Sequence, residues 1–281
     1  MRQLSITPLT VSTLTPPQFL RCAAQAGFGR VAMRILQGSP RNRPDNLPML
    51  VSGADRISEL CSILDGEGLV VSELEFILLD TETAVKEYRP FLEMGAALGG
   101  RYIAAGATDP ELSRAAEKLH ALCQMARECG VKVLIEFVRY STVRTLQDAV
   151  ALIKASGADD AGILLDTFHF YCAGNQPEDI LAYPASLFPY VQLSDVPASR
   201  PQDLKEIIRQ AREDRLNPGQ GQIDLPGIVR NLPPNLPVSI EVPNLTRIAQ
   251  VGELAHATQV RLDTEQLLRQ IDSARTIEMS C

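Results

Sequence analysis

Three carboxylate side chains stand at the ends of three short apolar runs, at Glu136, Asp166 and Glu241. A fourth run ends at the equivalent point in the amide of Gln192. A buried charge costs several kcal/mol when it lacks a partner, so three such positions indicate that the carboxylates converge on a shared one. A divalent cation is the simplest partner for converging carboxylates, and ion pairs at the rim of the fold are the alternative.

The elements that carry these residues are short β-branched runs that alternate with amphipathic helical stretches, a pattern typical of βα units and a parallel sheet. Strands are expected at Leu4–Thr10, Arg30–Ile35, Val70–Leu78, Tyr102–Ala105, Val131–Phe137, Gly162–Thr167, Tyr190–Leu193 and Val238–Val242. Helices are expected at Pro16–Gln25, Ala54–Glu67, Val85–Leu98, Pro110–Cys129, Thr145–Ser156, Leu204–Glu213, Asp224–Asn231 and, with a break inside it, Glu253–Arg275.

Eight strands and their helices predict a (β/α)8 TIM barrel in which residues 1–281 form one domain, with the active site at the carboxyl ends of the strands. A doubly wound open sheet is the alternative. It is disfavoured because no Gly-x-Gly-x-x-Gly motif follows a strand to mark a dinucleotide crevice. The proline-rich segment from Pro40 to Pro48 is expected to be a loop over the barrel mouth.

Composition excludes several classes of protein. The net charge of −7 over 281 residues argues against nucleic acid as a partner. No apolar run approaches the roughly 18 residues that span a bilayer, so no membrane partner is expected. The six cysteines form no CxxC pair and are expected to be small buried residues of a cytoplasmic protein. The first residues are read as a strand, with a signal peptide as the alternative. A homo-oligomer is left open.

The stretch from residue 131 to 243 resembles the xylose-isomerase-like TIM barrels, which include sugar and sugar-phosphate isomerases and epimerases, inosose dehydratases, 3-dehydroshikimate dehydratases and related endonucleases. The first half agrees more weakly, in element order and in a turn at Ala26-Gly27-Phe28. The matching pieces are IEF at Glu136, LLDTFHFY at Asp166 and His169, VQLSD at Gln192, RLNPGQGQIDLPG from Arg215 to Gly227, and SIEV at Glu241.

The resemblance implies one divalent metal ion held by four strand-end residues, which fall here on Glu136, Asp166, Gln192 and Glu241. The family usually has His at the third position, whereas this chain has Gln. An all-oxygen set favours Mg²⁺ or Mn²⁺, with Co²⁺ or Zn²⁺ as alternatives. The Gln variant and the PGQG loop also resemble one branch of bacterial 3-dehydroshikimate dehydratases.

Further charged residues at the strand ends are candidates for substrate contact. His169 is expected to contact substrate or to orient a metal-bound carboxylate, with a packed structural histidine as the alternative. Arg215 precedes the PGQG loop and is read either as a substrate-binding guanidinium or as an exposed arginine. The predicted substrate-binding residues are Arg34, Glu73, Arg139 and Arg215, with Glu75 on the same strand face as Glu73.

The predicted catalytic residues are Glu136, Glu241 and His169. A cation would acidify the proton next to the carbonyl of a small polyhydroxylated substrate, and one glutamate would remove that proton to give an enediolate. Return of a proton elsewhere makes the enzyme an isomerase or epimerase. Loss of a β-hydroxyl would make it a lyase of the 3-dehydroshikimate or inosose dehydratase kind. A barrel that only binds a polyol is the third reading. The three histidines are too few for the trinuclear endonucleases.

Overall fold

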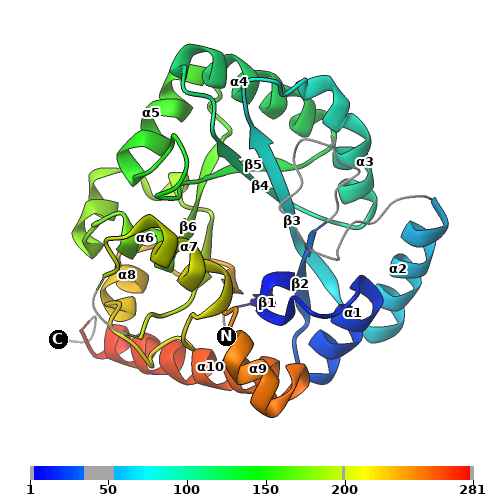
Figure 1. The fold of residues 1–281 in the computed structure, drawn as a ribbon, viewed down its shortest axis with the longest axis vertical. Helices are drawn as coiled ribbons and strands as arrows, with labels where there is room; N and C mark the ends of the chain where they lie inside the picture. Colours follow the sequence, from blue (N-terminus) through cyan, green and yellow to red (C-terminus); the bar gives the residue numbers. More distant parts are fainter. Residues whose placement is uncertain (1–2, 35–53, 198–199, 279–281) are drawn as a thin grey trace.

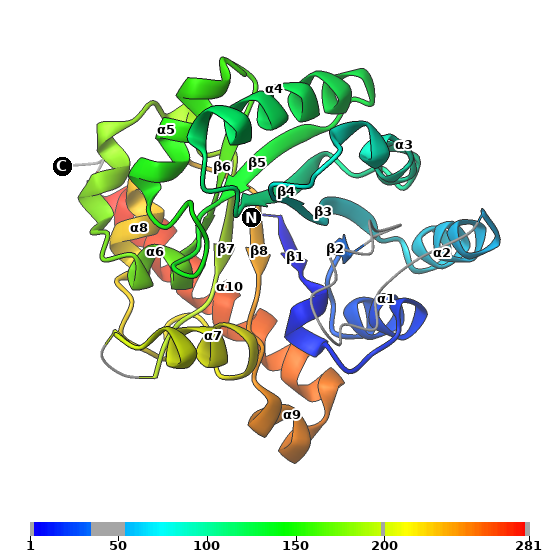
Figure 2. The ribbon, with the colours of Figure 1, turned by 45° about the horizontal axis from the view of Figure 1, so that its top comes forward.

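The computed structural model describes residues 3–34, 54–197 and 200–278, and in it eight parallel strands close into a barrel in sequence order, β1 to β8 (Figure 1). The helices surround the strands on the outside (Figure 2). The strands are β1 (Leu4–Ile6), β2 (Arg30–Arg34), β3 (Val70–Leu79), β4 (Tyr102–Ala107), β5 (Lys132–Glu136), β6 (Gly162–Asp166), β7 (Tyr190–Leu193) and β8 (Val238–Ile240). The predicted (β/α)8 barrel is therefore confirmed.

Ten α-helices are described, and none is long and apolar enough to cross a membrane. They are α1 (Pro16–Gln25), α2 (Ala54–Glu67), α3 (Arg89–Ala97), α4 (Leu112–Glu128), α5 (Leu146–Ser156), α6 (Thr167–Cys172), α7 (Leu204–Glu213), α8 (Leu225–Asn231), α9 (Leu245–Val251) and α10 (Glu253–Glu278). Short 3-10 helices occupy Pro8–Val11, Val85–Tyr88, Pro177–Ala182 and Ala185–Leu187.

The first strand is shorter than predicted. It ends at Ile6, and Pro8 opens a 3-10 helix instead of continuing to Thr10. Proline has no N–H to donate to a neighbouring strand, which explains the early end. Thr10 is nevertheless buried, and its hydroxyl donates to the carbonyl of Ile240, so this turn still closes the barrel between β1 and β8.

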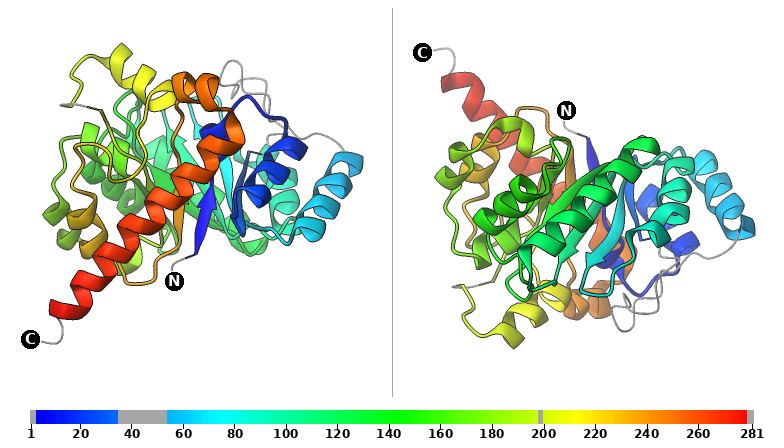
Figure 3. Two further views of the ribbon diagram at one scale, coloured as in Figure 1. Left: turned by 90° about the horizontal axis from the view of Figure 1, so that it is seen from below. Right: turned by 90° about the horizontal axis from the view of Figure 1, so that it is seen from above.

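The predicted break inside the last helix is wrong, because α10 continues uninterrupted from Glu253 to Glu278 as a single long rod along one side of the barrel (Figure 3). The break comes one residue earlier, at Gly252, whose positive φ of 81° ends α9. The predicted loop from Pro40 to Pro48 lies outside the described residues.

The lower lumen of the barrel is filled by a small apolar cluster of buried side chains from four adjacent strands, β4 to β7. Phe76 and Tyr102 pack against it. We call these residues the lower lumen cluster: Ala104, Leu134, Leu164 and Tyr190. Side chains two residues apart on a strand share a face, so the next inward-facing residues on β5, β6 and β7 are polar. They are Glu136, Asp166 and Gln192.

Candidate metal and proton-transfer site

Five carboxylates lie close together inside the carboxyl end of the barrel, and we call them the lumen carboxylates. Four of them are almost fully buried, and the side chain of Glu136 is 12% exposed. Burial raises the pKa of Glu136 well above its usual value, and the charges of Asp166 and Glu241 add to the effect. The set comprises Glu73 and Glu75 on β3, Glu136 and Asp166 at the ends of β5 and β6, and Glu241 directly after β8.

Arg215 is the guanidinium at the centre of this group. It is 1% exposed, and its Nη1 lies 2.7 Å from Oδ2 of Asp166 while Nη2 lies 3.0 Å from Oε2 of Glu241. The guanidinium also stacks 4.7 Å from the ring centroid of Phe168. Burial disfavours its charged form, but the charges of Asp166 and Glu241 outweigh that effect and raise the pKa of Arg215. The alternative of an exposed arginine is therefore wrong.

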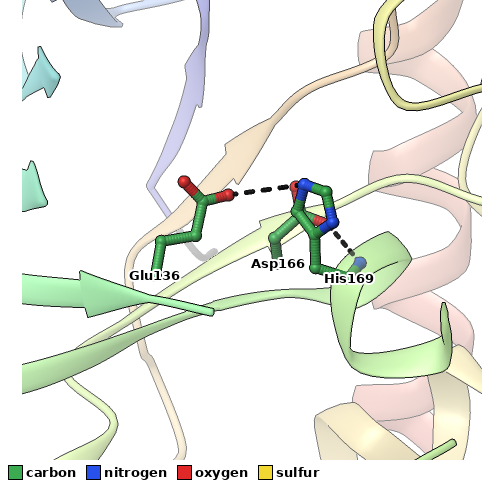
Figure 4. Close-up of side chains that lie close together, drawn as sticks. All are labelled: Glu136, Asp166 and His169. Carbon is green, nitrogen blue, oxygen red and sulfur yellow. Dashed lines mark hydrogen bonds and ion pairs between the residues drawn. The ribbon is translucent and has the colours of Figure 1, made fainter. Parts of the chain in front are cut away.

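The end of β6 brings Asp166 and His169 together with Glu136 (Figure 4). Asp166 caps α6, since its Oδ1 accepts from the backbone N–H groups of Phe168 and His169 at 2.7 and 3.2 Å. Nε2 of His169 lies 3.8 Å from Oε1 of Glu136. One ligand atom from each of Glu136, Asp166 and His169 falls within 4.8 Å of the others, so these three side chains could hold a metal ion.

His169 is almost fully buried, which lowers the pKa of its imidazole to about 4. The ring is therefore neutral at pH 7. Its Nδ1 is buried and has no hydrogen-bond partner among the described residues. A neutral imidazole can ligate a metal ion, a role that the sequence did not suggest for His169. The available signal was its position three residues after Asp166, on the first turn of a helix that starts at the strand end.

The nitrogen and oxygen ends of the Gln192 amide have different surroundings. Its Nε2 donates to both oxygens of Glu73, at 3.1 and 3.2 Å. Its Oε1 is buried and has no partner within the described part of the chain. A buried carbonyl without a partner costs about 1–3 kcal/mol, so this oxygen is placed for a group that the protein itself does not supply.

Two further arginines were predicted to bind substrate. Nη2 of Arg34 lies 2.8 Å from Oε2 of Glu75, and Oε1 of Glu75 is buried without a partner in the described ranges. Arg139 is half-buried just after β5, and its Nε has no partner among the residues that the structure describes. Arg34 thus pairs with a carboxylate through Nη2, and the Nε atoms of both Arg34 and Arg139 are without a partner among the described residues. Substrate contact by either residue stays a prediction.

The PGQG loop after α7 is anchored by Asp195. The carboxylate is 1% exposed and accepts hydrogen bonds from four backbone N–H groups. A Cβ at Gly221 would lie 2.2 Å from the carbonyl oxygen of Val196, so only glycine fits there. The donors are the N–H groups of Val196, Gly219, Gly221 and Ile223.

The donor set fits a hard divalent cation. The five lumen carboxyl groups face two guanidinium groups, those of Arg34 and Arg215, and burial raises the pKa of four of the five, so a further positive charge is needed to hold all of them in the charged form. Two oxygens that could ligate, Oε1 of Gln192 and Oε1 of Glu75, are buried without partners in the described structure. Carboxylate and amide oxygens are the ligands that Mg²⁺ and Mn²⁺ prefer.

The other two histidines lie away from these carboxylates. Nδ1 of His120 lies 2.9 Å from the carbonyl oxygen of Ser156, beside a hollow of about 570 Å³ between α4 and α5 on the outside of the barrel. His256 is fully buried, and its Nε2 lies 2.8 Å from the carbonyl oxygen of Val242. Both side chains join elements of the fold, and the hollow is not the site of the lumen carboxylates.

Comparison with known proteins gives consistent matches. A family model described as xylose isomerase-like TIM barrel matches residues 20–269. Inosose isomerase of Bacillus velezensis is 30% identical over 154 residues, which are 50% of this chain and 52% of that protein. The match thus spans about half the length of that relative.

3-Dehydroshikimate dehydratase of Pseudomonas aeruginosa is 26% identical over 243 residues, 81% of this chain and 35% of that protein. A crystal structure of the IOLI protein with a bound zinc atom superimposes with a TM-score of 0.77 at 18% identity, covering 96% of this chain and 99% of that one.

Proposed function

Because this chain belongs to the xylose isomerase-like TIM barrel family, we propose that it is a metal-dependent isomerase or epimerase of a small polyhydroxylated carbonyl compound, a sugar, a sugar phosphate or a cyclic polyol ketone. The observation that carries the proposal is the cluster of five lumen carboxylates opposed by two guanidinium groups. A packed structural core has no use for such an excess of buried negative charge. A cation and a proton-transfer reaction together account for it.

The proposed ligands are Glu136, Asp166, Gln192 and Glu241, with Mg²⁺ or Mn²⁺ as the favoured ion and Co²⁺ or Zn²⁺ as alternatives. The zinc atom of the IOLI structure supports a divalent ion in a barrel of this fold, and the unpartnered Oε1 of Gln192 supports a place for one here. When bound, such an ion polarises the substrate carbonyl and acidifies the neighbouring C–H. His169 is the alternative ligand if the ion sits between Glu136 and Asp166.

Proton transfer falls to Glu136 and Glu241, with His169 beside the first. Burial raises the pKa of Glu241 to about 7, although Arg215 opposes the rise. A carboxylate with a pKa near the working pH is suited to accept and return a proton. The two glutamates come from β5 and from the end of β8, so they approach a substrate from different sides of the barrel. That arrangement supports removal of a proton at one position and its return at another.

A dehydratase is the second candidate, and one contact favours it. Arg215 holds Oε2 of Glu241, whereas Glu136 has no arginine or lysine within 4 Å among the described residues and faces neutral His169. Glu136 alone could remove a proton from the substrate and, as the resulting carboxylic acid, give that proton to the departing hydroxyl, which leaves as water. The match to 3-dehydroshikimate dehydratase, which covers more of this chain than the inosose isomerase match does, also supports this candidate.

The deciding experiment measures metal content and then follows proton exchange in deuterium oxide. The purified protein is loaded with Mn²⁺ and offered ketoses, inososes and 3-dehydroshikimate. An isomerase or epimerase incorporates deuterium and yields an isomer of the same mass apart from the label. A dehydratase yields a product that is lighter by one water. A protein that binds no divalent metal and exchanges no proton with any compound of the panel would refute both candidates and leave a polyol-binding barrel.

A further inference from the structure

The amide of Gln192 is held at one end only. Its Nε2 donates to both oxygens of Glu73, and its Oε1 has no partner in the described ranges although the residue is 2% exposed. The nitrogen and oxygen ends of an amide have nearly the same shape, so the pocket alone does not choose between the two orientations. The chemistry of the neighbour chooses: the deprotonated form of Glu73 accepts hydrogen bonds and repels an amide oxygen, although burial and the charges of Glu75 and Glu241 raise the pKa of its carboxyl group well above the usual value.

Glu73 contacts Gln192 from inside the barrel, and the predicted contact of Glu73 with substrate stays a prediction. Glu73 is fully buried, and it makes no ion pair with any described residue. Below it lies Tyr190, two residues before Gln192 on the same strand, with its hydroxyl 2.8 Å from Oγ of Ser5. Both oxygens of Glu73 accept from the Gln192 amide, and the buried hydroxyl of Tyr190 also interacts with Glu73. Of these two neighbours, Gln192 is the one that belongs to the proposed ligand set.

We propose that Glu73 is a positioning residue that fixes the Gln192 amide with its oxygen toward the cation, and thereby lets an amide serve as the third metal ligand. This inference rests on the proposed metal site. A reversed amide would set its oxygen against two carboxylate oxygens and present an N–H group to the cation, so both contacts oppose the reversal. Loss of Glu73 frees the amide to reverse or to move away from the ion. Supporting partners of metal ligands typically contribute 10–100-fold in affinity.

Three substitutions separate hydrogen-bond geometry from charge. Glu73→Asp keeps the charge and withdraws the acceptor oxygens by one methylene. Glu73→Gln removes the charge and offers both an acceptor oxygen and a donor N–H group, so it can pair with either orientation of the Gln192 amide. Glu73→Met has a side chain of similar length and removes both the charge and the acceptor oxygens. Positioning predicts that the Mn²⁺ affinity measured by calorimetry falls about 10–100-fold in all three variants, Glu73→Asp included.

The matched control is Asp109→Asn, outside the lumen carboxylates. It also removes one buried negative charge, but Asp109 contacts Arg114 and Lys118 and not the Gln192 amide, so Mn²⁺ affinity is expected to stay close to wild type. If Glu73→Asp keeps the wild-type affinity while Glu73→Gln loses it, charge and not orientation is the contribution of Glu73, and the proposal is overturned. Should Glu73→Met not fold by circular dichroism, the Gln and Asp variants still decide.

A double-mutant cycle tests whether Glu73 acts through Gln192. Gln192→Met removes the amide, and adding Glu73→Asp to it is expected to cause no further loss of Mn²⁺ affinity. A further loss of the full 10–100-fold would make Glu73 a direct ligand and overturn the proposal. Wild-type protein that binds no Mn²⁺ would overturn the metal site and this inference together. If the wild-type protein binds Mn²⁺ and Glu73→Asp binds it with the same affinity, the metal site stands and only this inference is overturned.

Discussion

The lower lumen cluster and the charged layer above it are built by the same strands, two residues apart. Leu134 and Glu136 share a face of β5, and Leu164 and Asp166 share a face of β6. The apolar residues are fully buried and contact one another, whereas the carboxylates raise one another's pKa values and depend on Arg215. A step of two residues along each strand therefore leads from side chains that need only close packing to side chains whose charges must be compensated.

The difference between the two layers shows which of them makes the site rigid. The lower layer needs no partner beyond its own atoms, so it stabilises the strands whether or not a ligand is bound. The upper layer is not self-sufficient, because its negative charge exceeds that of the arginines that face it. The packed lower lumen cluster thus holds the strands together and keeps the carboxylates of the upper layer close to one another in spite of their mutual repulsion.

The largest expected effect comes from Glu136→Gln in the upper layer. An amide retains an oxygen ligand but cannot accept a proton, so turnover on the true substrate is expected to fall about 10²–10⁴-fold while Mn²⁺ still binds. The control is Leu134→Ala on the same strand face, which should leave turnover per folded molecule nearly unchanged. Near-normal turnover in Glu136→Gln would make Glu136 a ligand only. Steady-state kinetics and calorimetry on both variants give the comparison.

Arg215→Met is expected to destabilise the metal-free protein by about 3–5 kcal/mol, since it leaves Asp166 and Glu241 buried without their cation. Saturating Mn²⁺ should recover part of the loss, because ligand binding stabilises the folded state. Urea unfolding with and without Mn²⁺ measures both. Arg127→Met is the matched control, since the pair of Arg127 with Asp160 is exposed and should be worth about 1 kcal/mol or less. Equal losses of unfolding free energy in the two variants would contradict the prediction that Arg215 stabilises the fold by compensating buried carboxylates.

In the lower layer, Leu164→Ala is expected to cost about 2–5 kcal/mol in the free energy of unfolding by opening a cavity among fully buried side chains. Its Mn²⁺ affinity is expected to stay at the wild-type value, because Asp166 keeps its cap on α6 and its contact with Arg215. Urea unfolding and calorimetry on one preparation test both parts. A large loss of metal affinity would show that the two layers are not separable.

The free energy of unfolding should depend on pH through the titrating groups of the upper layer, Glu241 and His169. Burial raises the pKa of Glu241 to about 7, so its contribution in the metal-free protein is present below about pH 4.3 and is lost as the pH rises through 7. His169, with its pKa lowered to about 4, acts oppositely and loses its contribution as the pH falls from about 6.5. The stability of wild type relative to Glu241→Gln should therefore decline from pH 5 to pH 8 in urea titrations. A constant difference would mean that Glu241 does not titrate in this window.

The smallest effect is expected from Gln192→His. Imidazole is the better ligand for late first-row metals, so overall affinity should be kept or raised while the preference moves from Mg²⁺ and Mn²⁺ toward Co²⁺ and Zn²⁺. Competitive calorimetry with Mn²⁺ and Zn²⁺ measures the shift. Complete loss of metal binding would show that the amide of Gln192 has another role.

Much of the fold was accessible from the sequence, because strands and helices each have their own period. The apolar run before Glu136 and the one before Asp166 both end where the structure ends β5 and β6. Eight such runs with helices between them leave few alternatives to a closed barrel. What failed was local chemistry, such as the early end of β1 before Pro8 and the position of the break at Gly252.

The contacts within the site were less accessible. Arg215 is 49 residues from Asp166 and 26 from the carbonyl of Glu241, and its contact with both depends on the path of the intervening loops. Periodicity says which face a residue takes on a strand, but it says nothing of where a loop residue comes to lie. The contact of Gln192 with Glu73, 119 residues apart, likewise follows only from closure of the barrel.

The anchoring of the PGQG loop by Asp195 has a consequence for how the protein can change. The backbone of this loop and of Ile223 just after it is fixed from within by three hydrogen bonds to one buried carboxylate, while the side chains of Gln220 and Gln222 are exposed. Backbone position and side-chain identity are therefore separate here. Substitutions at Gln220 and Gln222 can alter what the rim presents to solvent without displacing Arg215, which makes the loop a natural starting point for directed evolution of this barrel.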